Sequence, residues 1–337
     1  MIDPAPDAHA YLFVYMHNYS GSAAVAVHTD FLSLSHLRRK DVQTLLGLSV
    51  DLRSKNMFTQ ALQGKSIALI FEKPSLRTRV TFEIAIRQLG GWPIMLGTAE
   101  SRLGEREPIQ DLARNLSCWV DAIVARVFKH HDLEDLALFA TIPVINGLSD
   151  HEHPCQAIAD VLTLMEVWPS FSRKELVYVG DWNNVSRSLL QICSLAGLGF
   201  RAICPEKYGP APEEHVDWSA KPSDVKGADA VYTDVWASMG QEHELAERID
   251  IFRAYQVNEE LMAKTGKQSF FMHCLPAHRG QEVTDSVIES EYSLVFQQAA
   301  NRLPVEKAIL VTVLGVGAAA GRANVKRKDG EQLWEKK

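Results

Sequence analysis

Hydrophobic residues in this chain form short unbroken runs that alternate with longer stretches of helical period. Apolar runs of about four to eight residues, bounded by turn-forming residues, are typical of buried strands. In the first half such strands are expected at 66–71, 93–96, 122–127 and 141–145. In the second half they are expected at 176–181, 200–204, 228–234 and 269–274. Strands that alternate with helices favour parallel sheets. The pattern predicts an α/β fold of two domains, each a mostly parallel sheet flanked by helices.

Chain length supports two domains, because 337 residues exceed the usual size of a single one. A polar, turn-forming segment at 169–173 is expected to link them. We interpret residues 1–28 as an N-terminal extension, 29–168 as the first domain and 174–302 as the second.

The segment 66–79 joins the first expected strand to a helix that carries two arginines. Ser75 occupies the position expected for the helix N-cap, where its hydroxyl can accept a hydrogen bond from a backbone N–H. The first N–H groups of a helix have no intrahelical partner, and the helix dipole favours a negative charge beside them. Arg77 adds a guanidinium fork and Thr78 adds a hydroxyl. This combination predicts a phosphate-binding site.

Two helices are relevant to that site. The first is expected at 78–89, with Val80 and Ile84 among its buried residues. Near the end of the chain, a polar turn is expected to place Arg302 just ahead of a C-terminal helix at 303–325.

Several polar side chains follow the carboxyl ends of expected strands. They are Arg126 in the first half and Asn184, Asp234 and Cys274 in the second. In open α/β sheets, ligands bind outside these strand ends. We therefore expect the three residues of the second half to line one cleft.

His153 and Gln156 lie three residues apart at the start of an expected helix. A ring N–H and an amide at this spacing can be aimed at one small polar ligand. The pair His151 and His153 could also suggest a metal site. However, Pro154 follows and no further ligand occurs at helical spacing. We expect no metal here.

Composition narrows the classes of function. A net charge of -7 and a pI near 6.0 argue against a nucleic-acid partner, which would need a basic face. No stretch approaches the roughly 18–20 apolar residues of a membrane span. The five cysteines include no C-x-x-C pair, so neither a disulfide framework nor a zinc ribbon is predicted. Reduced thiols fit the cytoplasm best, and we expect a cytoplasmic protein.

A dinucleotide site is a further alternative, since the second half begins as an α/β unit. The strand at 176–181 is not followed by the G-x-G-x-x-G fingerprint. A similar glycine pattern at 315–321 follows a helical run and leaves no room for a βαβ unit, so we interpret it as a small-residue packing stretch.

Seven motifs follow one another along the chain. They are Ser75-Leu76-Arg77-Thr78-Arg79, Arg126, His153-Pro154-Cys155-Gln156, Gly180-Asp181-Trp182-Asn183-Asn184, Asp234 with Ser238-Met239-Gly240, His273-Cys274-Leu275-Pro276, and Asn301-Arg302. Each motif alone is weak, but their order resembles the carbamoyltransferases. The Ser238 and His273 motifs resemble the ornithine carbamoyltransferases in particular. The resemblance extends over residues 31–314.

The resemblance implies transfer of a carbamoyl group from carbamoyl phosphate to L-ornithine, which yields L-citrulline and phosphate. The reaction serves arginine biosynthesis or, reversed, arginine catabolism. It implies that the carbamoyl phosphate-binding residues are Ser75, Leu76, Arg77, Thr78, Arg126, His153, Gln156, Cys274, Leu275 and Arg302. The ornithine-binding residues implied are Asn184, Asp234, Ser238 and Met239. Among all of these, the resemblance gives Arg126, His153 and Cys274 a catalytic role.

The first domain would bind carbamoyl phosphate, the second would bind ornithine, and the C-terminal helix would return to the first. The resemblance also implies a homotrimer or a multiple of trimers, with active sites at subunit interfaces and with no metal or organic cofactor. Two positions depart from the family. Arg102 stands where a loop glutamine is usual, and Leu76 stands where threonine is commoner.

Two other functions stay open at this point. One is a carbamoyltransferase for another amine, such as putrescine or an N-acylornithine. The other is a non-catalytic protein that binds a phosphate ligand.

Overall fold

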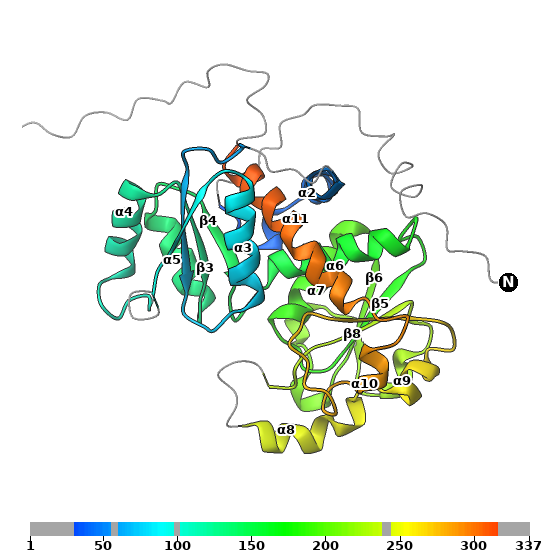
Figure 1. Cartoon of the computed structure of the whole chain (residues 1–337). Coiled ribbons are helices and arrows are strands. Elements are labelled where there is room, and N and C mark those ends of the chain that lie inside the picture. Colours follow the sequence, from blue (N-terminus) through cyan, green and yellow to red (C-terminus); the bar gives the residue numbers. More distant parts are fainter. Residues whose placement is uncertain (1–29, 55–59, 98–101, 238–243, 316–337) are drawn as a thin grey trace, which may run out of the picture.

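The strands form two separate sheets in the computed structural model, which describes residues 30–54, 60–97, 102–237 and 244–315. Helices cover the sheets to give two lobes that lie side by side in Figure 1. The predicted fold class, α/β with two parallel sheets flanked by helices, is confirmed. The N-terminal extension expected at 1–28 lies outside the described residues.

The first sheet has the strand order β2-β1-β3-β4, and each neighbouring pair is parallel. Its strands are β1 (Ser66–Phe71), β2 (Trp92–Met95), β3 (Ala122–Arg126) and β4 (Val144–Leu148). The central strand β1 is an uninterrupted apolar run because both of its faces are buried, as is usual in parallel sheets.

The second sheet has the order β7-β6-β5-β8-β9 and is also parallel throughout. Its strands are β5 (Glu175–Val179), β6 (Gly199–Ile203), β7 (Trp218–Ser219), β8 (Ala230–Thr233) and β9 (Phe270–His273).

Each sheet has one point at which the strand order reverses. In the first sheet the chain moves outward from β1 to β2 and then returns to β3 on the other side, so the reversal lies between β1 and β3. In the second sheet it lies between β5 and β8 for the same reason. Loops on the two sides of such a point diverge and leave a crevice at the carboxyl ends of the strands. These two crevices are the places where ligands are expected.

Ten α-helices connect and cover the strands within the described residues. They are α2 (Arg39–Ser54), α3 (Arg77–Gln88), α4 (Ile109–Trp119), α5 (His130–Phe139), α6 (Pro154–Val167), α7 (Asn184–Ala196), α8 (Leu245–Phe252), α9 (Glu259–Lys264), α10 (Asp285–Ile288) and α11 (Val295–Val313). None of the described helices is both long and apolar enough to cross a membrane.

One hydrophobic cluster runs through both lobes. It contains Leu69 of the first sheet, Tyr178 of the second, Ile158 of α6 and Ile309 of α11. Helix α11 packs against α2, α3 and α6. Figure 1 shows α11 crossing from one lobe to the other. Burial of this shared core fixes the strand ends of the two sheets relative to each other.

The prediction for the start of the C-terminal helix is wrong. Helix α11 begins at Val295, so Arg302 lies inside it and Pro304 is an internal proline. The polar residues of the expected turn are buried and find partners on other helices: Asn301 donates to Thr163 on α6, and Arg302 donates to Thr78 on α3. These tertiary contacts outweigh the local turn signal. Residues 316–325 of the expected helix, and most of the glycine-containing stretch 315–321, lie outside the described residues.

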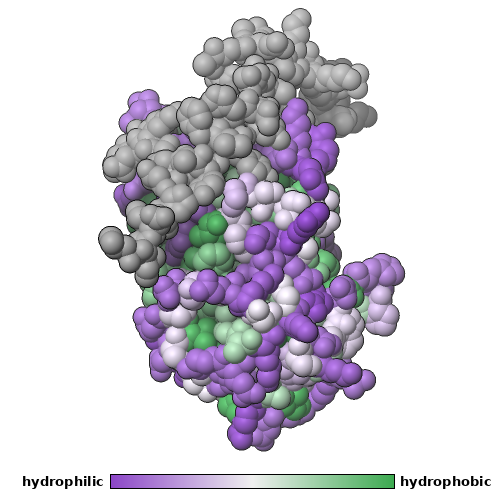
Figure 2. All heavy atoms as spheres, turned by 90° about the vertical axis from the view of Figure 1, so that its right-hand side faces the viewer, coloured by the Kyte–Doolittle hydropathy of each residue, from purple (hydrophilic) through white to green (hydrophobic). Residues whose placement is uncertain are grey.

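The prediction that α3 buries Val80 and Ile84 is also wrong, because both side chains are exposed. The buried face of α3 carries Phe82, Ala85 and Ile86 instead. The face of the molecule in Figure 2 is largely hydrophilic, with hydrophobic residues in small separate areas. The exposed apolar side chains of α3 are candidates for a contact surface.

Candidate active site between the two sheets

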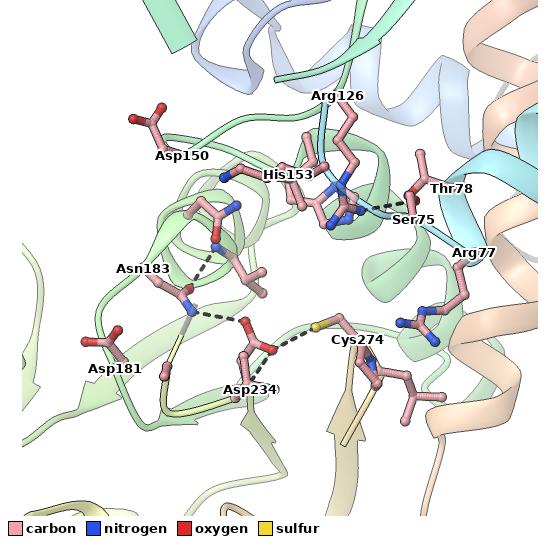
Figure 3. A pocket seen from close by; sticks show the side chains of 18 of the residues that line it. Ser75, Arg77, Thr78, Arg126, Asp150, His153, Asp181, Asn183, Asp234 and Cys274 are labelled. Carbon is pink, nitrogen blue, oxygen red and sulfur yellow. Dashed lines mark hydrogen bonds between the residues drawn. The ribbon is translucent and has the colours of Figure 1, made fainter. Parts of the chain in front are cut away.

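A pocket of about 820 Å³ lies where the strand ends of the two lobes face each other. Its walls come from the segments that follow β1, β3 and β4 in one lobe and β5, β8 and β9 in the other. Figure 3 shows Ser75, Thr78 and Arg126 on one side and Asp234 on the other, with Cys274 between Asp234 and Arg77. The pocket thus contains a cationic half and an anionic half.

Three arginines, Arg77, Arg126 and Arg302, supply the cationic half. Arg126 ends β3 beside the last residue of β1, and Arg302 reaches the same pocket from α11. Burial, followed by repulsion from Arg302 and Arg77, lowers the pKa of Arg126 to about 10. Burial and Arg302 likewise lower the pKa of Arg77. Guanidinium groups repel one another's positive charge, so a bound anion would stabilise their charged forms.

The turn between β1 and α3 lies against these arginines. Ser75 is not the helix cap that the sequence predicted, because α3 begins at Arg77 and the capping position is Leu76, which makes no side-chain cap. The Ser75 hydroxyl accepts a hydrogen bond of 3.2 Å from Arg126 Nη1 instead. Thr78 Oγ1 accepts one of 2.9 Å from Arg302 Nη2. The first turn of α3 still presents its N–H groups to this pocket.

His153 lines the pocket at the start of α6, and its backbone N–H donates to Ser188 Oγ over 2.8 Å. Burial lowers the pKa of His153 well below its ordinary value, and the nearby arginines lower it further. The imidazole is therefore neutral near pH 7. Its Nδ1 has no hydrogen-bond partner among the described residues. His151 does not join it, since that ring is exposed beside His130.

Gln156 lies directly behind the pocket wall. Its Oε1 accepts a hydrogen bond of 2.7 Å from Arg302 Nη1, and its Nε2 donates to Asp160 Oδ1 over 2.7 Å. The side chain is fully enclosed and is not among the pocket-lining residues. In this conformation Gln156 orients Arg302.

Asp234 is the centre of the anionic half. Its carboxylate accepts hydrogen bonds from Asn183 Nδ2 over 3.0 Å, from the Val235 N–H over 2.8 Å and from Cys274 Sγ over 3.1 Å. Asn183 also caps α7, because its Oδ1 accepts from the N–H groups of Val185 and Ser186. The cap of α7 thus fixes the Asp234 side chain. An anchored carboxylate of this kind can bind an ammonium group.

Cys274 follows β9 and carries a protonated thiol. Burial raises its pKa well above the ordinary value, and the negative charge of Asp234 raises it further. Leu275, which also lines the pocket, has φ 58°, a left-handed conformation that is unusual for a branched side chain. Residues in this conformation cluster at functional sites.

Asn184 lines the pocket on the first turn of α7, and its Nδ2 donates to the Ser149 carbonyl over 2.7 Å. Of the expected site residues, Ser238 and Met239 lie outside the described residues. Arg102, the position of the family departure, is exposed on the surface and pairs with Glu105 over 2.8 Å. It does not line the pocket of its own chain.

Asp234, His273 and Cys274 form the one group among the described residues whose ligand atoms lie close enough together to hold a metal ion. All three already have protein partners. Cys274 donates to Asp234, and His273 Nδ1 accepts from the Leu275 N–H over 2.8 Å. The absence of a metal stays a prediction from the sequence.

The pocket lining also includes charged residues that were not among the expected site residues, such as Lys73, Asp181 and Arg248. Asp181 follows the carboxyl end of β5, so the strand-end rule could have identified it. It accepts a hydrogen bond of 2.8 Å from Arg248 Nη1, which also donates to the Trp236 carbonyl. Arg248 lies on α8, and nothing in its local sequence marks it.

Comparison with known proteins agrees with this geometry. Residues 29–166 match the family model for the aspartate/ornithine carbamoyltransferase carbamoyl-P binding domain, and residues 172–313 match that for the Asp/Orn binding domain. The chain is 47% identical over 297 residues to an ornithine carbamoyltransferase of Shewanella oneidensis, a match that covers 84% of this chain and 98% of the relative. It is 49% identical over 269 residues to the anabolic ornithine carbamoyltransferase of Pyrococcus furiosus, with 75% and 85% covered.

Among solved structures, the ornithine carbamoyltransferase of Thermus thermophilus superposes with a TM-score of 0.80 at 42% identity. That match covers 86% of this chain and all of the relative. The enzyme of Pyrococcus furiosus superposes with a TM-score of 0.78 at 45% identity, over 85% of this chain and 97% of that one. The order of motifs, the two facing strand ends and these similarities agree, and the chain belongs to the aspartate/ornithine carbamoyltransferase family.

Proposed function

We propose that this protein transfers the carbamoyl group of carbamoyl phosphate to the side-chain amine of L-ornithine, releasing L-citrulline and phosphate. The observation that carries the proposal is the pocket itself. It places three arginines at the N-terminus of α3, opposite a fixed carboxylate, Asp234. One half suits a phosphate and the other an amino acid, and the family relationship supplies the reaction that joins them.

On the cationic side, the phosphate would lie at the first turn of α3, held by Ser75, Arg77, Thr78 and the backbone at Leu76. Arg302 would complete this site, with Gln156 behind it. Burial and, after it, repulsion from Arg302 and Arg77 lower the pKa of Arg126, and a bound dianion would offset that repulsion.

Arg126 and His153 would then face the carbamoyl oxygen. Attack by the amine on the carbamoyl carbon forms a C–N bond and places negative charge on that oxygen. The C–O bond to phosphate breaks as the charge returns, and the proton lost by the amine nitrogen ends on the departing phosphate. Since His153 is neutral, it can donate one N–H hydrogen bond to the oxygen without being protonated.

On the anionic side, Asp234 would bind the α-ammonium group of ornithine, and Asn184 would lie beside the α-carboxylate. Ser238 and Met239 would complete the amino-acid site. The family resemblance would put Cys274 next to the attacking amine, and Cys274 lines the pocket between Asp234 and Arg77. The Leu275 carbonyl would accept a hydrogen bond from the carbamoyl NH2 group.

We also propose the domain division 29–168 and 174–302, a cytoplasmic location, and a homotrimer or a multiple of trimers. The two family matches support the division, with α11 packed on α2 and α3 of the first lobe. The five free thiols support a reducing compartment. Exposed apolar side chains on α3 and β2, close to the pocket wall, support a subunit contact there.

The test is a citrulline assay with the purified protein. Ornithine, putrescine, N-acetylornithine and aspartate should be offered in parallel with carbamoyl phosphate. Ornithine is expected to be carbamoylated with the highest kcat/KM. The proposal fails if no citrulline forms, and a product from putrescine or N-acetylornithine alone would favour the other amine as substrate.

A further inference from the structure

Asp160 is a fully buried carboxylate in the middle of α6, and it does not line the pocket. Its Oδ1 accepts hydrogen bonds from Gln156 Nε2 over 2.7 Å and from Gln298 Nε2 over 2.8 Å. Its Oδ2 accepts from the Tyr232 hydroxyl over 3.1 Å. A buried carboxylate is costly unless it is fully hydrogen-bonded, and these three contacts meet that need.

Each of the three partners of Asp160 leads to a different part of the pocket. Gln156 uses its oxygen to hold Arg302 in the cationic half. Gln298 uses its oxygen to accept from the His273 N–H over 3.0 Å, next to Cys274. Tyr232 lies on β8, two residues before Asp234. Asp160 is therefore connected to both halves of the pocket from behind.

The carboxylate also decides which way the two amides face. An ionised carboxylate only accepts, whereas an amide side chain donates at its nitrogen and accepts at its oxygen. Asp160 thus holds the NH2 groups of Gln156 and Gln298 toward itself, and their oxygens must point toward Arg302 and His273. An asparagine at 160 would offer one oxygen and one NH2 group, so it could not accept from all three partners in this way.

We propose that Asp160 is a positioning residue that couples the two substrate sites. Through Gln156 it sets the guanidinium that faces the phosphate, and through Gln298 and Tyr232 it sets the strand ends that carry Cys274 and Asp234. This inference rests on the proposed function. Burial raises the pKa of Asp160 to about 6, so the carboxylate is ionised at the pH of the experiment below.

The coupling is measured with two unreactive ligands by titration calorimetry at pH 8. Phosphonoacetamide is carbamoyl phosphate with a methylene in place of the bridging oxygen. L-Norvaline is ornithine without its side-chain amine. In the wild-type protein, saturating phosphonoacetamide is expected to tighten norvaline binding about 10-fold or more. In Asp160→Asn this factor is expected to fall below about 3, although phosphonoacetamide alone still binds.

Asp229→Asn is the matched control. Asp229 is also a buried carboxylate with hydrogen bonds from Lys174 and from the Glu175 N–H, but it precedes β8 at the end away from the pocket. It should keep the wild-type coupling factor. Gln298→Met is a second variant, in case Asp160→Asn does not fold. It removes the hydrogen bonds of Gln298 to Asp160 and His273 but leaves those of Gln156. It should weaken the coupling with little change in phosphonoacetamide affinity.

The inference is overturned if Asp160→Asn, or Gln298→Met in its place, keeps coupling within about twofold of the wild type. It is also overturned if Asp229→Asn loses coupling to the same extent, or if the wild type shows none. The citrulline assay separates these results from failure of the proposed function. A wild-type enzyme that makes citrulline while Asp160→Asn stays fully coupled would contradict this inference alone.

Discussion

Arg302 Nη2 on α11 donates a hydrogen bond of 2.9 Å to Thr78 Oγ1 on α3, across 224 residues of sequence. The same guanidinium donates to Gln156 and pairs with Glu306 over 2.7 Å. Arg302 is almost entirely buried. The C-terminal helix therefore supplies one wall of the cationic half, at the turn where the first strand meets its helix.

Replacing Arg302 by lysine keeps the positive charge but removes the planar fork. A single ammonium cannot reproduce donors to Thr78, Gln156 and Glu306 at once. Since each hydrogen bond to a charged group contributes about 1.5–3 kcal/mol, loss of one that acts on the substrate side should lower kcat/KM for carbamoyl phosphate about 10–100-fold. Steady-state kinetics with varied carbamoyl phosphate measures this.

Arg114→Lys is the control for that substitution, because Arg114 is exposed and its nearest carboxylate oxygen, on Asp111, is 3.7 Å away. It should leave kcat/KM unchanged. An Arg302→Lys enzyme with wild-type kinetics would show that only the charge matters at this position.

Glu306 should make stability depend on pH near neutrality. Burial raises its pKa from 4.5 to about 7, and Arg302 opposes that shift. The folded protein favours the protonated form of Glu306, whereas the unfolded chain ionises above pH 4.5. The stability that Glu306 contributes is therefore present below pH 4.5 and is lost as the pH rises toward 7. Glu306→Gln cannot titrate. Between pH 5 and pH 7.5 the variant should therefore gain about 2 kcal/mol relative to the wild type.

Urea unfolding at intervals across this range measures the effect. Glu247→Gln is the comparison, since Glu247 is fully exposed and its pKa is lowered by Lys207 rather than raised. The free energy of unfolding of that variant should change with pH in the same way as that of the wild type from pH 5 to 7.5. If the free energy of unfolding of Glu306→Gln also follows that of the wild type across this range, a raised pKa of Glu306 in the folded protein is contradicted.

Much of this site could be predicted from local sequence, because the residues concerned follow strands. Arg126, Asp234 and Cys274 each come directly after an apolar run, and parallel strands gather their carboxyl ends at one edge. The order of strands is not encoded locally, but any parallel order leaves Arg126 at the carboxyl edge of the first sheet, and Asp234 and Cys274 at that of the second.

The residues that were misplaced or missed depend on distant partners. Asn301 lies in a stretch that looks like a turn, yet it bonds Thr163, 138 positions away, and belongs to a continuous helix. Gln156 bonds Asp160 and Arg302 at its two ends, and its contact with carbamoyl phosphate stays a prediction. Arg248 has no local signal at all. Contacts of this range arise only when the two lobes pack together.

Cys274 should react slowly with alkylating agents although it lies in the pocket. The thiolate is the reactive form, and burial together with Asp234 raises the pKa of this thiol. At pH 8, iodoacetamide should modify the exposed Cys118 at least about tenfold faster than Cys274. Peptide mass spectrometry over time gives both rates in one sample.

Asp234→Asn tests the cause of that difference. Removing the negative charge should lower the pKa of Cys274 and speed its alkylation, while the rate at Cys118 stays constant. Equal rates at the two cysteines of the wild type would rule out a protonated thiol at Cys274.

The exposed apolar side chains of the first lobe should form the contact between subunits. Val80 and Ile84 lie four residues apart, on one face of α3. Trp92 and Ile94 alternate along β2, which is the edge strand beside this helix. Large apolar side chains gathered on two adjacent elements are typical of an interface.

Ile84→Glu would place a charge in that contact, where a buried unpaired carboxylate is strongly unfavourable. Light scattering should give about 113 kDa, three times the chain mass of 37.6 kDa, or a multiple of it for the wild type, and a smaller species for the variant. Phe296→Glu is the control, because Phe296 is similarly exposed but lies in the first turn of α11. It should keep the wild-type mass. If the active sites lie at subunit interfaces, Ile84→Glu should also lose citrulline formation, and full activity in a monomeric variant would contradict a shared site.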